Sequence, residues 1–246
     1  MTMCAVCGCG PARAHDHGAE PTHDHHADGG DEASRTVLLE QRVLARNDQL
    51  ADANRAWLRR RDVVAVNLMS SPGSGKTTLL ERTIRDVGDQ FGISVIEGDQ
   101  ETPLDADRIR AAGRPVVQIN TGSGCHLDAA MVERALAEVD PEAGSIVFIE
   151  NVGNLVCPAL FDLGERASVV VISVTEGADK PLKYPRMFRG ADLVVVNKSD
   201  LLPYVDFDLA NFGDAVRSVN PGVRIVVVSA RTGDGVGSWY DELLLL

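Results

Sequence analysis

The stretch Val63–Thr78, VVAVNLMSSPGSGKTT, joins an apolar run to a glycine-rich segment and then to the start of a predicted helix. Its second half fits the pattern G-x-x-x-x-G-K-[ST], except that Ser70 replaces the first glycine. Gly73 and Gly75 allow backbone N–H groups to close around phosphate oxygens at the N-terminus of the helix. The stretch therefore predicts a strand, a phosphate-binding loop and a helix, in that order.

The residue types in this loop predict separate roles in nucleotide binding. Lys76 is expected to reach the β- and γ-phosphates, and the Thr77 hydroxyl to bind Mg²⁺. Ser74 and Thr78 belong to the same predicted nucleotide-binding segment.

Six further apolar runs follow the same alternation of strand, loop and helix. They are short, rich in β-branched residues and mostly apolar on both faces, which is typical of a parallel sheet covered by helices. The predicted strands are 63–69, 93–97, 115–120, 145–150, 168–174, 192–197 and 223–229, with helices at 76–88, 127–138 and 206–219 among others. We predict one α/β domain over residues 62–246, with a doubly wound, mostly parallel sheet.

Two segments precede this domain. Residues 34–61 have apolar side chains at helical spacing and predict an amphipathic helix that packs on the domain, with Ser34 as its N-cap. Residues 1–33 hold almost no large apolar side chains, so we expect a disordered tail.

The sequence Asn197-Lys198-Ser199-Asp200 follows a predicted strand and indicates which base is bound. A carboxylate offers only acceptors, and guanine presents two neighbouring donors to it, whereas adenine presents one donor and one acceptor. Ser229 and Ala230 follow the last strand, where backbone N–H groups are expected to face guanine O6. The predicted nucleotide is GTP, with GDP as its product.

Two strand-end loops are expected to sense the γ-phosphate. Asp99 and Glu150 each lie at a strand end, and together with Thr77 they are predicted to hold Mg²⁺ or its water shell. Gly153 follows in the second of these loops and is expected to contact the nucleotide. Lys76, Asp99 and Glu150 are the predicted catalytic residues. No glutamine is evident to position water, so slow intrinsic hydrolysis is the hypothesis.

Soft metal ligands occur in two places. Cys125, His126 and Cys157 lie in loops expected to converge at the carboxyl end of the sheet, where two thiolates and an imidazole suit Zn²⁺ or Ni²⁺. The alternative is coincidence, with Cys157 simply packed in the core. The tail holds Cys4, Cys7 and Cys9 as a predicted tight metal site. The alternative for the histidines of the tail is a solvated linker. The five histidines predicted to store metal weakly are His15, His17, His23, His25 and His26.

The composition limits the classes of partner and compartment. The net charge of −12 argues against a nucleic-acid or anionic-membrane surface, and no apolar run is long enough to cross a membrane. The N-terminus lacks the pattern of a signal peptide, so the predicted compartment is the cytoplasm. In that reducing compartment the five cysteines are expected to be ligands or thiols rather than disulfides.

The combination resembles the HypB family, the hydrogenase nickel-incorporation GTPases of the SIMIBI class of P-loop proteins. The matching segments span nearly the whole domain, and Cys4-x-x-Cys7-x-Cys9 is similar to the family's N-terminal nickel motif. They are SSPGSGKTTLLERT, VIEGDQET, QINTGSGCHLDAAMV, FIENVGNLVCPALFDLGE, TEGADKPLKYP and VVNKSDLLPY.

The resemblance implies a GTPase that delivers Ni²⁺ to the large-subunit precursor of [NiFe] hydrogenase together with a HypA-type nickel chaperone. It implies a GTP-dependent homodimer, low GTPase activity coupled to metal transfer, and a Cys125–His126–Cys157 metal site at or near the dimer interface. In some relatives the first cysteine follows the initiator methionine, so that the α-amine is a fourth nickel ligand. Here that arrangement requires translation to start at Met3 rather than Met1.

Three other functions fit parts of the pattern. A generic GTPase with a metal-buffering tail is the first, and a pure nickel-storage protein is the second. The third is the urease nickel GTPase, whose metal motif is Cys-Pro-His, whereas Cys125 and His126 are adjacent here and Cys157 is separate.

Overall fold

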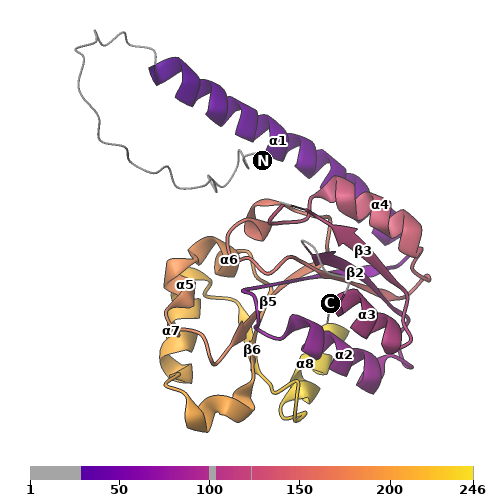
Figure 1. The fold of residues 1–246 in the computed structure, drawn as a ribbon, viewed down its shortest axis with the longest axis vertical. Helices are drawn as coiled ribbons and strands as arrows, with labels where there is room; N and C mark the ends of the chain where they lie inside the picture. Colours follow the sequence, from indigo (N-terminus) through magenta and orange to yellow (C-terminus); the bar gives the residue numbers. More distant parts are fainter. Residues whose placement is uncertain (1–28, 100–103, 123, 246) are drawn as a thin grey trace, which may run out of the picture.

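The core of the molecule is a seven-stranded sheet in which every pair of neighbouring strands is parallel (Figure 1). The computed structural model describes residues 29–99, 104–122 and 124–245. The strand order is β3-β2-β4-β1-β5-β6-β7. The strands are β1 (Val64–Ser70), β2 (Ile93–Asp99), β3 (Val116–Asn120), β4 (Ile146–Glu150), β5 (Ala167–Ser173), β6 (Leu193–Asn197) and β7 (Arg224–Val227).

The seven predicted strands and the doubly wound α/β fold are confirmed. Each observed strand overlaps its predicted run and differs from it by no more than two residues at either end. The reason is burial on both faces: Val66, Val95 and Val195 face one layer of helices, whereas Ala65, Ile96 and Val194 face the other. Such strands need apolar residues at every position.

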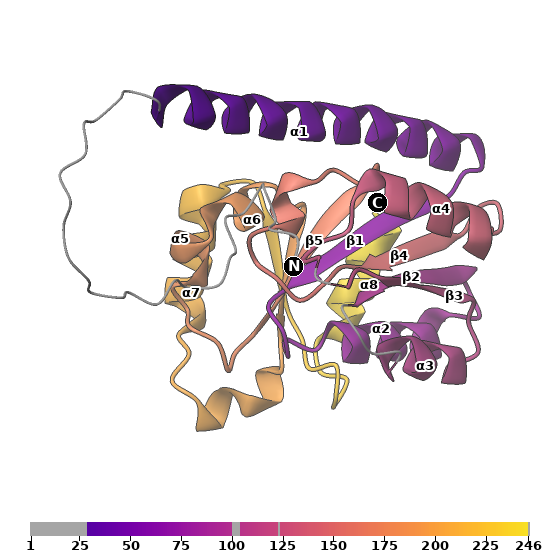
Figure 2. The same cartoon turned by 45° about the horizontal axis from the view of Figure 1, so that its top comes forward.

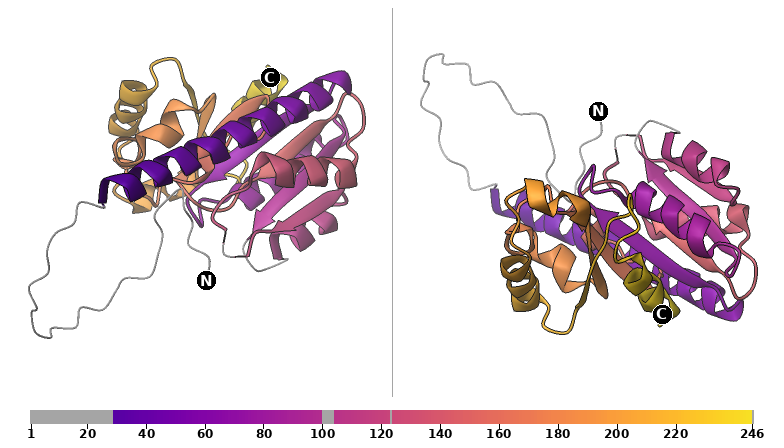
Figure 3. Two further views of the ribbon diagram at one scale, coloured as in Figure 1. Left: turned by 90° about the horizontal axis from the view of Figure 1, so that it is seen from above. Right: turned by 90° about the horizontal axis from the view of Figure 1, so that it is seen from below.

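Helices cover both faces of the sheet, as Figures 2 and 3 show from several sides. One face packs against α2 (Lys76–Val87), α3 (Leu104–Ala111) and α8 (Val236–Leu244). The other face packs against α1 (Gly29–Arg60), α4 (Ala129–Val139), α6 (Pro185–Arg189) and α7 (Leu209–Val219). The short elements are η1 (Pro158–Leu160), α5 (Lys180–Lys183) and η2 (Ser199–Tyr204).

Helix α1 is longer than predicted and only partly attached to the domain. It begins at Gly29, so Ser34 lies inside the helix and the prediction of Ser34 as its N-cap is wrong. Its C-terminal half docks through buried Ala51 and Leu58, whereas its N-terminal half projects away from the domain surface (Figure 1). Between the projecting half and the domain lies a groove, lined by Val37 and Leu44 on the helix and by Val156 and Tyr184 on the domain. The projecting half carries exposed apolar side chains at Val37, Leu38, Leu39 and Val43.

Only the last five residues of the predicted tail, 29–33, are among the residues that the structure describes. Residues 29–33 belong to α1, so the tail predicted over 1–33 is too long by these residues. Cys4, Cys7, Cys9 and the five tail histidines lie outside the described residues, and their roles stay predictions. Among the described residues, no helix combines the length and hydropathy needed to cross a bilayer.

Candidate functional site

The loop between β1 and α2 has the backbone conformation of a phosphate cradle. Gly75 has φ +93°, and a Cβ at this position would lie 2.6 Å from Asn197 Nδ2. Gly73 also has positive φ, at +75°. Both positions have the left-handed backbone conformation that favours glycine. At Gly75 a side chain would also collide with Asn197 at the end of β6. The helix α2 begins directly after Gly75, so its N-terminal N–H groups face the loop.

Ser70, which stands where the pattern has its first glycine, takes part in the hydrogen bonds of the loop. It ends β1 and is fully buried, and Lys76 Nζ donates to its Oγ at 2.7 Å. The Ser70 hydroxyl in turn donates to the carbonyl of Ser71 at 2.7 Å. Burial lowers the pKa of Lys76, although the carboxylate of Glu150 opposes this shift. The lysine head is thus held inside the cradle, where an anionic phosphate would stabilise its charge.

Acidic side chains line the opposite wall of the same pocket. Thr77 Oγ1 donates to Glu150 Oε1 at 2.6 Å, which joins the start of α2 to the end of β4. Glu150 Oε2 is buried and has no hydrogen-bond partner among the described residues. Burial raises the pKa of Glu150, while Lys76 and Thr77 oppose the shift. Asp99 and Asp105 line the pocket too, which has a volume of about 500 Å³.

This donor set fits a divalent cation that prefers oxygen ligands. The Thr77 hydroxyl and the carboxylates of Asp99 and Glu150, including the unpartnered Oε2 of Glu150, line the pocket where a phosphate chain would end. Gly153, from the loop after β4, closes the wall: a Cβ there would lie 3.1 Å from Pro72 Cα. The loop that follows Glu150 is therefore packed directly on the phosphate loop.

The residues after β6 support the phosphate loop as well as the predicted base pocket. Asn197 Nδ2 donates to the Ser74 carbonyl at 3.0 Å, and Lys198 Nζ donates to the Gly73 carbonyl at 2.7 Å. Lys198 has a left-handed backbone conformation, with φ +62°. The β6 end is thus tied to the phosphate loop at two carbonyl groups.

The Asp200 carboxylate is positioned by the last loop of the domain. Ser229 Oγ donates to Asp200 Oδ1 at 2.7 Å. The Ala230 N–H donates to Asn197 Oδ1 at 3.0 Å, and the Ser229 N–H to the Asp234 carbonyl at 2.8 Å. Both of these N–H groups are engaged within the protein. Ser229 and Ala230 therefore support Asn197 and Asp200 in this structure, and their predicted contact with guanine stays a prediction.

The structure brings the predicted cysteine–histidine set together. The ligand atoms of Cys125, His126 and Cys157 lie within 4.8 Å of one another. The two Sγ atoms are 2.7 Å apart, and Cys125 Sγ is 3.7 Å from His126 Nδ1. Burial lowers the pKa of His126, which favours the neutral imidazole that binds metals. The His126 ring stacks on Phe161 with centroids 3.9 Å apart.

One buried asparagine connects the two candidate sites. Asn151 follows Glu150 directly, and its Oδ1 accepts from the N–H of Leu127, next to His126, at 3.3 Å. Its Nδ2 donates to Asn67 Oδ1 at 3.3 Å, and Asn67 Nδ2 donates to Glu165 Oε1 at 3.0 Å. No sequence motif predicted this chain, because its members are far apart in sequence. It links the Glu150 loop to the loops that carry the metal ligands.

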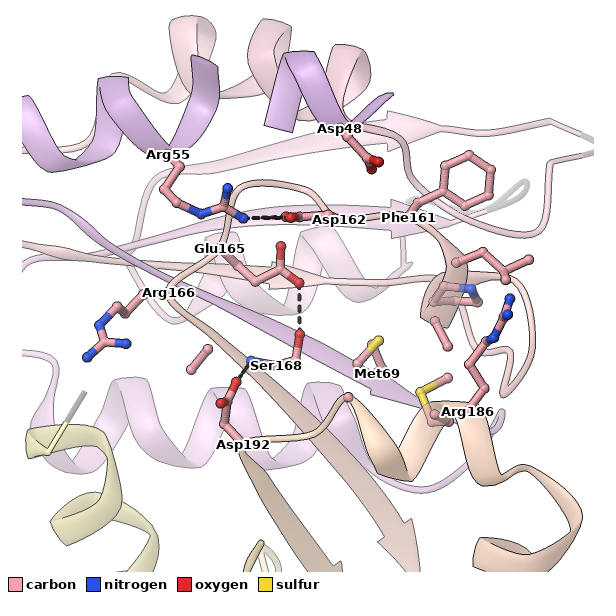
Figure 4. Close-up of a pocket in the computed structure, with 16 residues that line it drawn as sticks. Asp48, Arg55, Met69, Phe161, Asp162, Glu165, Arg166, Ser168, Arg186 and Asp192 are labelled. Carbon is pink, nitrogen blue, oxygen red and sulfur yellow. Dashed lines mark hydrogen bonds and ion pairs between the residues drawn. The ribbon is translucent and has the colours of Figure 1, made fainter. Parts of the chain in front are cut away.

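A cavity of about 360 Å³ lies beside the cluster on the α1 side (Figure 4). Phe161 lines it on the side where it stacks on His126. In Figure 4, Arg55 points at Asp162, and Glu165 is joined to Ser168. The cavity shares no lining residue with the phosphate pocket, and Phe161 is its contact with the His126 ring.

Comparison with known proteins agrees with this geometry. The model of the family described as "CobW/HypB/UreG, nucleotide-binding domain" matches residues 64–227. The hydrogenase maturation factor HypB of Azotobacter vinelandii is 54% identical over 94% of this chain and 73% of its own length.

Two solved structures are similar over most of the chain. The HypB structure from Archaeoglobus fulgidus has a TM-score of 0.76 and 43% identity, over 81% of this chain and 98% of its own. The structure described as HypB from Helicobacter pylori in complex with nickel has a TM-score of 0.76 and 38% identity, over 81% of this chain and 94% of its own. With its phosphate cradle, its Asn-Lys-Ser-Asp segment and its Cys–His–Cys cluster on one scaffold, the chain belongs to the HypB family of hydrogenase maturation factors.

Proposed function

We propose that this chain binds and hydrolyses GTP and uses the cycle to deliver Ni²⁺ to the large-subunit precursor of [NiFe] hydrogenase. The single observation that carries the proposal is the Asn151 bridge, which joins the phosphate pocket to the Cys125–His126–Cys157 cluster. The family model and the nickel complex of the Helicobacter pylori relative support the nucleotide and the metal. The metal is cargo in this proposal and is passed on.

The nucleotide half of the proposal assigns roles to residues of the pocket. Lys76 neutralises the β- and γ-phosphates, and Asp200 accepts from the guanine donors. Thr77, Asp99 and Glu150 hold Mg²⁺, which when bound neutralises charge on the phosphate oxygens. Slow intrinsic hydrolysis, which the sequence predicts, is part of the proposal.

The coupling follows from the way the β4 loop is fixed. Gly153 packs on the phosphate loop, and Asn151 accepts a hydrogen bond from the Leu127 N–H. Cys157 lies in the same segment after β4 as these two residues. A rearrangement of Glu150 on loss of the γ-phosphate moves the chain that leads to Cys157. The distance between the Cys157 thiolate and the Cys125–His126 pair then changes, and with it the nickel affinity.

The remaining parts of the proposal concern the tail and the partners. Cys4, Cys7 and Cys9 form a tight nickel site, and the five tail histidines store nickel weakly. The protein works as a GTP-dependent homodimer in the cytoplasm, with a HypA-type nickel chaperone. Zn²⁺ shares the ligand preferences of the G-domain cluster, so it competes there.

The test is the nickel affinity of the full chain with GDP and with a non-hydrolysable GTP analogue. We expect the two nucleotides to give affinities that differ at least several-fold in the wild type, and no such difference in Cys157→Ala. Equal affinities in the wild type contradict the coupling. Lys76→Ala is the matched functional variant: pure storage predicts normal hydrogenase maturation in cells, whereas our proposal predicts its loss.

A further inference from the structure

The docking face of α1 contains two buried asparagines among apolar residues. Asn47 is 5% exposed and Asn54 is 3% exposed, and they lie seven residues apart on the face that also holds Ala51 and Leu58. Seven residues are two helical turns, so both side chains point at the domain. Buried amides at such positions require partners, because an unpaired polar group in a core destabilises it.

Their partners are backbone groups of two separate loops. Asn47 Oδ1 accepts from the Ala129 N–H at 2.9 Å, and its Nδ2 donates to the Asp162 carbonyl at 2.7 Å. Asn54 Nδ2 donates to the Ala129 carbonyl at 2.9 Å and to the Leu163 carbonyl at 3.0 Å. Each asparagine therefore bridges the start of α4 to the segment after η1.

These two loops are the ones that carry the metal ligands. Ala129 is three residues after His126, and Asp162 is five residues after Cys157. The residue before Asp162 is Phe161, on which the His126 ring stacks at an interplanar angle of 18°. The asparagine pair thus spans from the Cys125–His126 side of the cluster to the Cys157 side.

Two further contacts fix α1 against the second loop. Gly164 has φ +89°, and a Cβ there would lie 2.5 Å from the Ala51 carbonyl, so the chain touches the helix backbone. Arg55 also donates to both carboxylate oxygens of Asp162, at 2.7 and 2.6 Å (Figure 4). The helix and the segment after η1 therefore form one rigid contact.

We propose that Asn47 and Asn54 are positioning residues of the Cys125–His126–Cys157 site, and that α1 sets the separation of its two loops. Movement of α1 away from Ala129 or Leu163 separates the cysteine of one loop from the cysteine–histidine pair of the other. Nickel affinity therefore depends on how α1 is docked. The proposal rests on the metal site proposed above.

The experiment uses the full chain with Cys4, Cys7 and Cys9 replaced by serine, titrated with Ni²⁺ alone. Cys125 and Cys157 are then the only remaining cysteines, so thiolate-to-nickel charge-transfer absorption reports this site and not the histidine tail. Asn54→Ala removes both hydrogen bonds of one bridge, and Asn47→Asp keeps the acceptor for Ala129 but loses the donor to Asp162. Gln49→Ala, on the exposed face of the same helix, is the control.

We expect both asparagine variants to bind Ni²⁺ about tenfold more weakly, as for the loss of other groups that orient metal ligands, with a shifted charge-transfer band. The GDP affinity of both variants should equal that of the parent protein, in which Cys4, Cys7 and Cys9 are serine. Gln49→Ala should also match this parent protein. If both variants keep the charge-transfer band and the nickel affinity, the inference about α1 is wrong, but the proposed metal site stands. The same holds if the variants lose GDP affinity together with nickel affinity. If Asn54→Ala does not fold, the milder Asn47→Asp decides. A parent protein without any thiolate band overturns the proposed metal site as well.

Discussion

Glu97 offers a quantitative test of the electrostatics beneath the phosphate pocket. It lies on β2 directly opposite Glu150 on β4, so both side chains point to the same face of the sheet. It is only 2% exposed, and its Oε2 has no hydrogen-bond partner among the described residues. Burial raises the pKa of Glu97 from 4.5 to about 8, and the carboxylate of Glu150 adds to the shift.

The raised pKa fixes the sign and the size of the effect on stability. The folded protein holds the Glu97 proton more tightly than the unfolded chain, so its contribution is present below pH 4.5 and is lost as pH rises through about 8. At about 1.4 kcal/mol per pH unit, the full interval corresponds to roughly 5 kcal/mol. Glu150 shares the titration, so we expect about 2–4 kcal/mol between pH 5 and pH 9.

The perturbation is Glu97→Gln, which keeps the shape of the side chain and removes the titration. Urea unfolding of the metal- and nucleotide-free protein should show the variant gaining about 2–4 kcal/mol relative to the wild type between pH 5 and pH 9. Lys76 and His126 titrate in both proteins and cancel to first order. Exposed Glu138→Gln on α4 is the control and should follow the wild type. Parallel pH profiles for Glu97→Gln and the wild type would refute the reasoning.

Two further predictions concern a core hydrogen bond and the base pocket. Trp239 Nε1 donates to buried Thr83 Oγ1 at 2.9 Å, so Thr83→Val should lower the free energy of unfolding by about 1–3 kcal/mol, measured by urea denaturation. An unchanged midpoint in Thr83→Val contradicts this assignment. On the proposal that Asp200 accepts from guanine, Asp200→Asn places an amide donor against the guanine donors, so GTP affinity should fall at least tenfold while the melting temperature stays near that of the wild type. Unchanged GTP binding by calorimetry would place guanine elsewhere.

The sheet could be predicted because each strand is defined by its own local pattern. Runs such as 168–174 and 192–197 are apolar at every position and are bounded by turn residues, which leaves one interpretation. Helix α3 is harder: it has eight residues, of which only Ala106 and Ile109 are buried, so its apolar periodicity is weak. The start of α1 was placed too late because Ser34 resembles an N-cap, whereas Asp31 and Glu32 near Gly29 also favour a helix start.

The candidate site divides in the same way between local motifs and tertiary contacts. Lys76, Thr77, Asp200 and the Cys125–His126 pair stand in short motifs whose chemistry can be recognised from sequence. The pairing of Glu97 with Glu150 depends on strand order, which places β2 beside β4. Asn47 and Asn54 lie in no motif, and Asn151 lies in the matching segment FIENVGNLVCPALFDLGE, which predicts no partner for its side chain. The partners that join them to other loops are 24 or more residues away along the chain and are evident only in the folded structure.

The projecting half of α1 acts as a lever arm on the molecule. The 18 residues from Gly29 to Arg46 precede the first docking asparagine and, at 1.5 Å per residue, extend about 27 Å. A tilt of about 5° about the docked half displaces the far end by about 2 Å while moving the Asn47 amide by only a few tenths of an ångström. By the same ratio, a force applied at the Gly29 end of α1 acts several-fold more strongly near Asn47, where the helix contacts the domain.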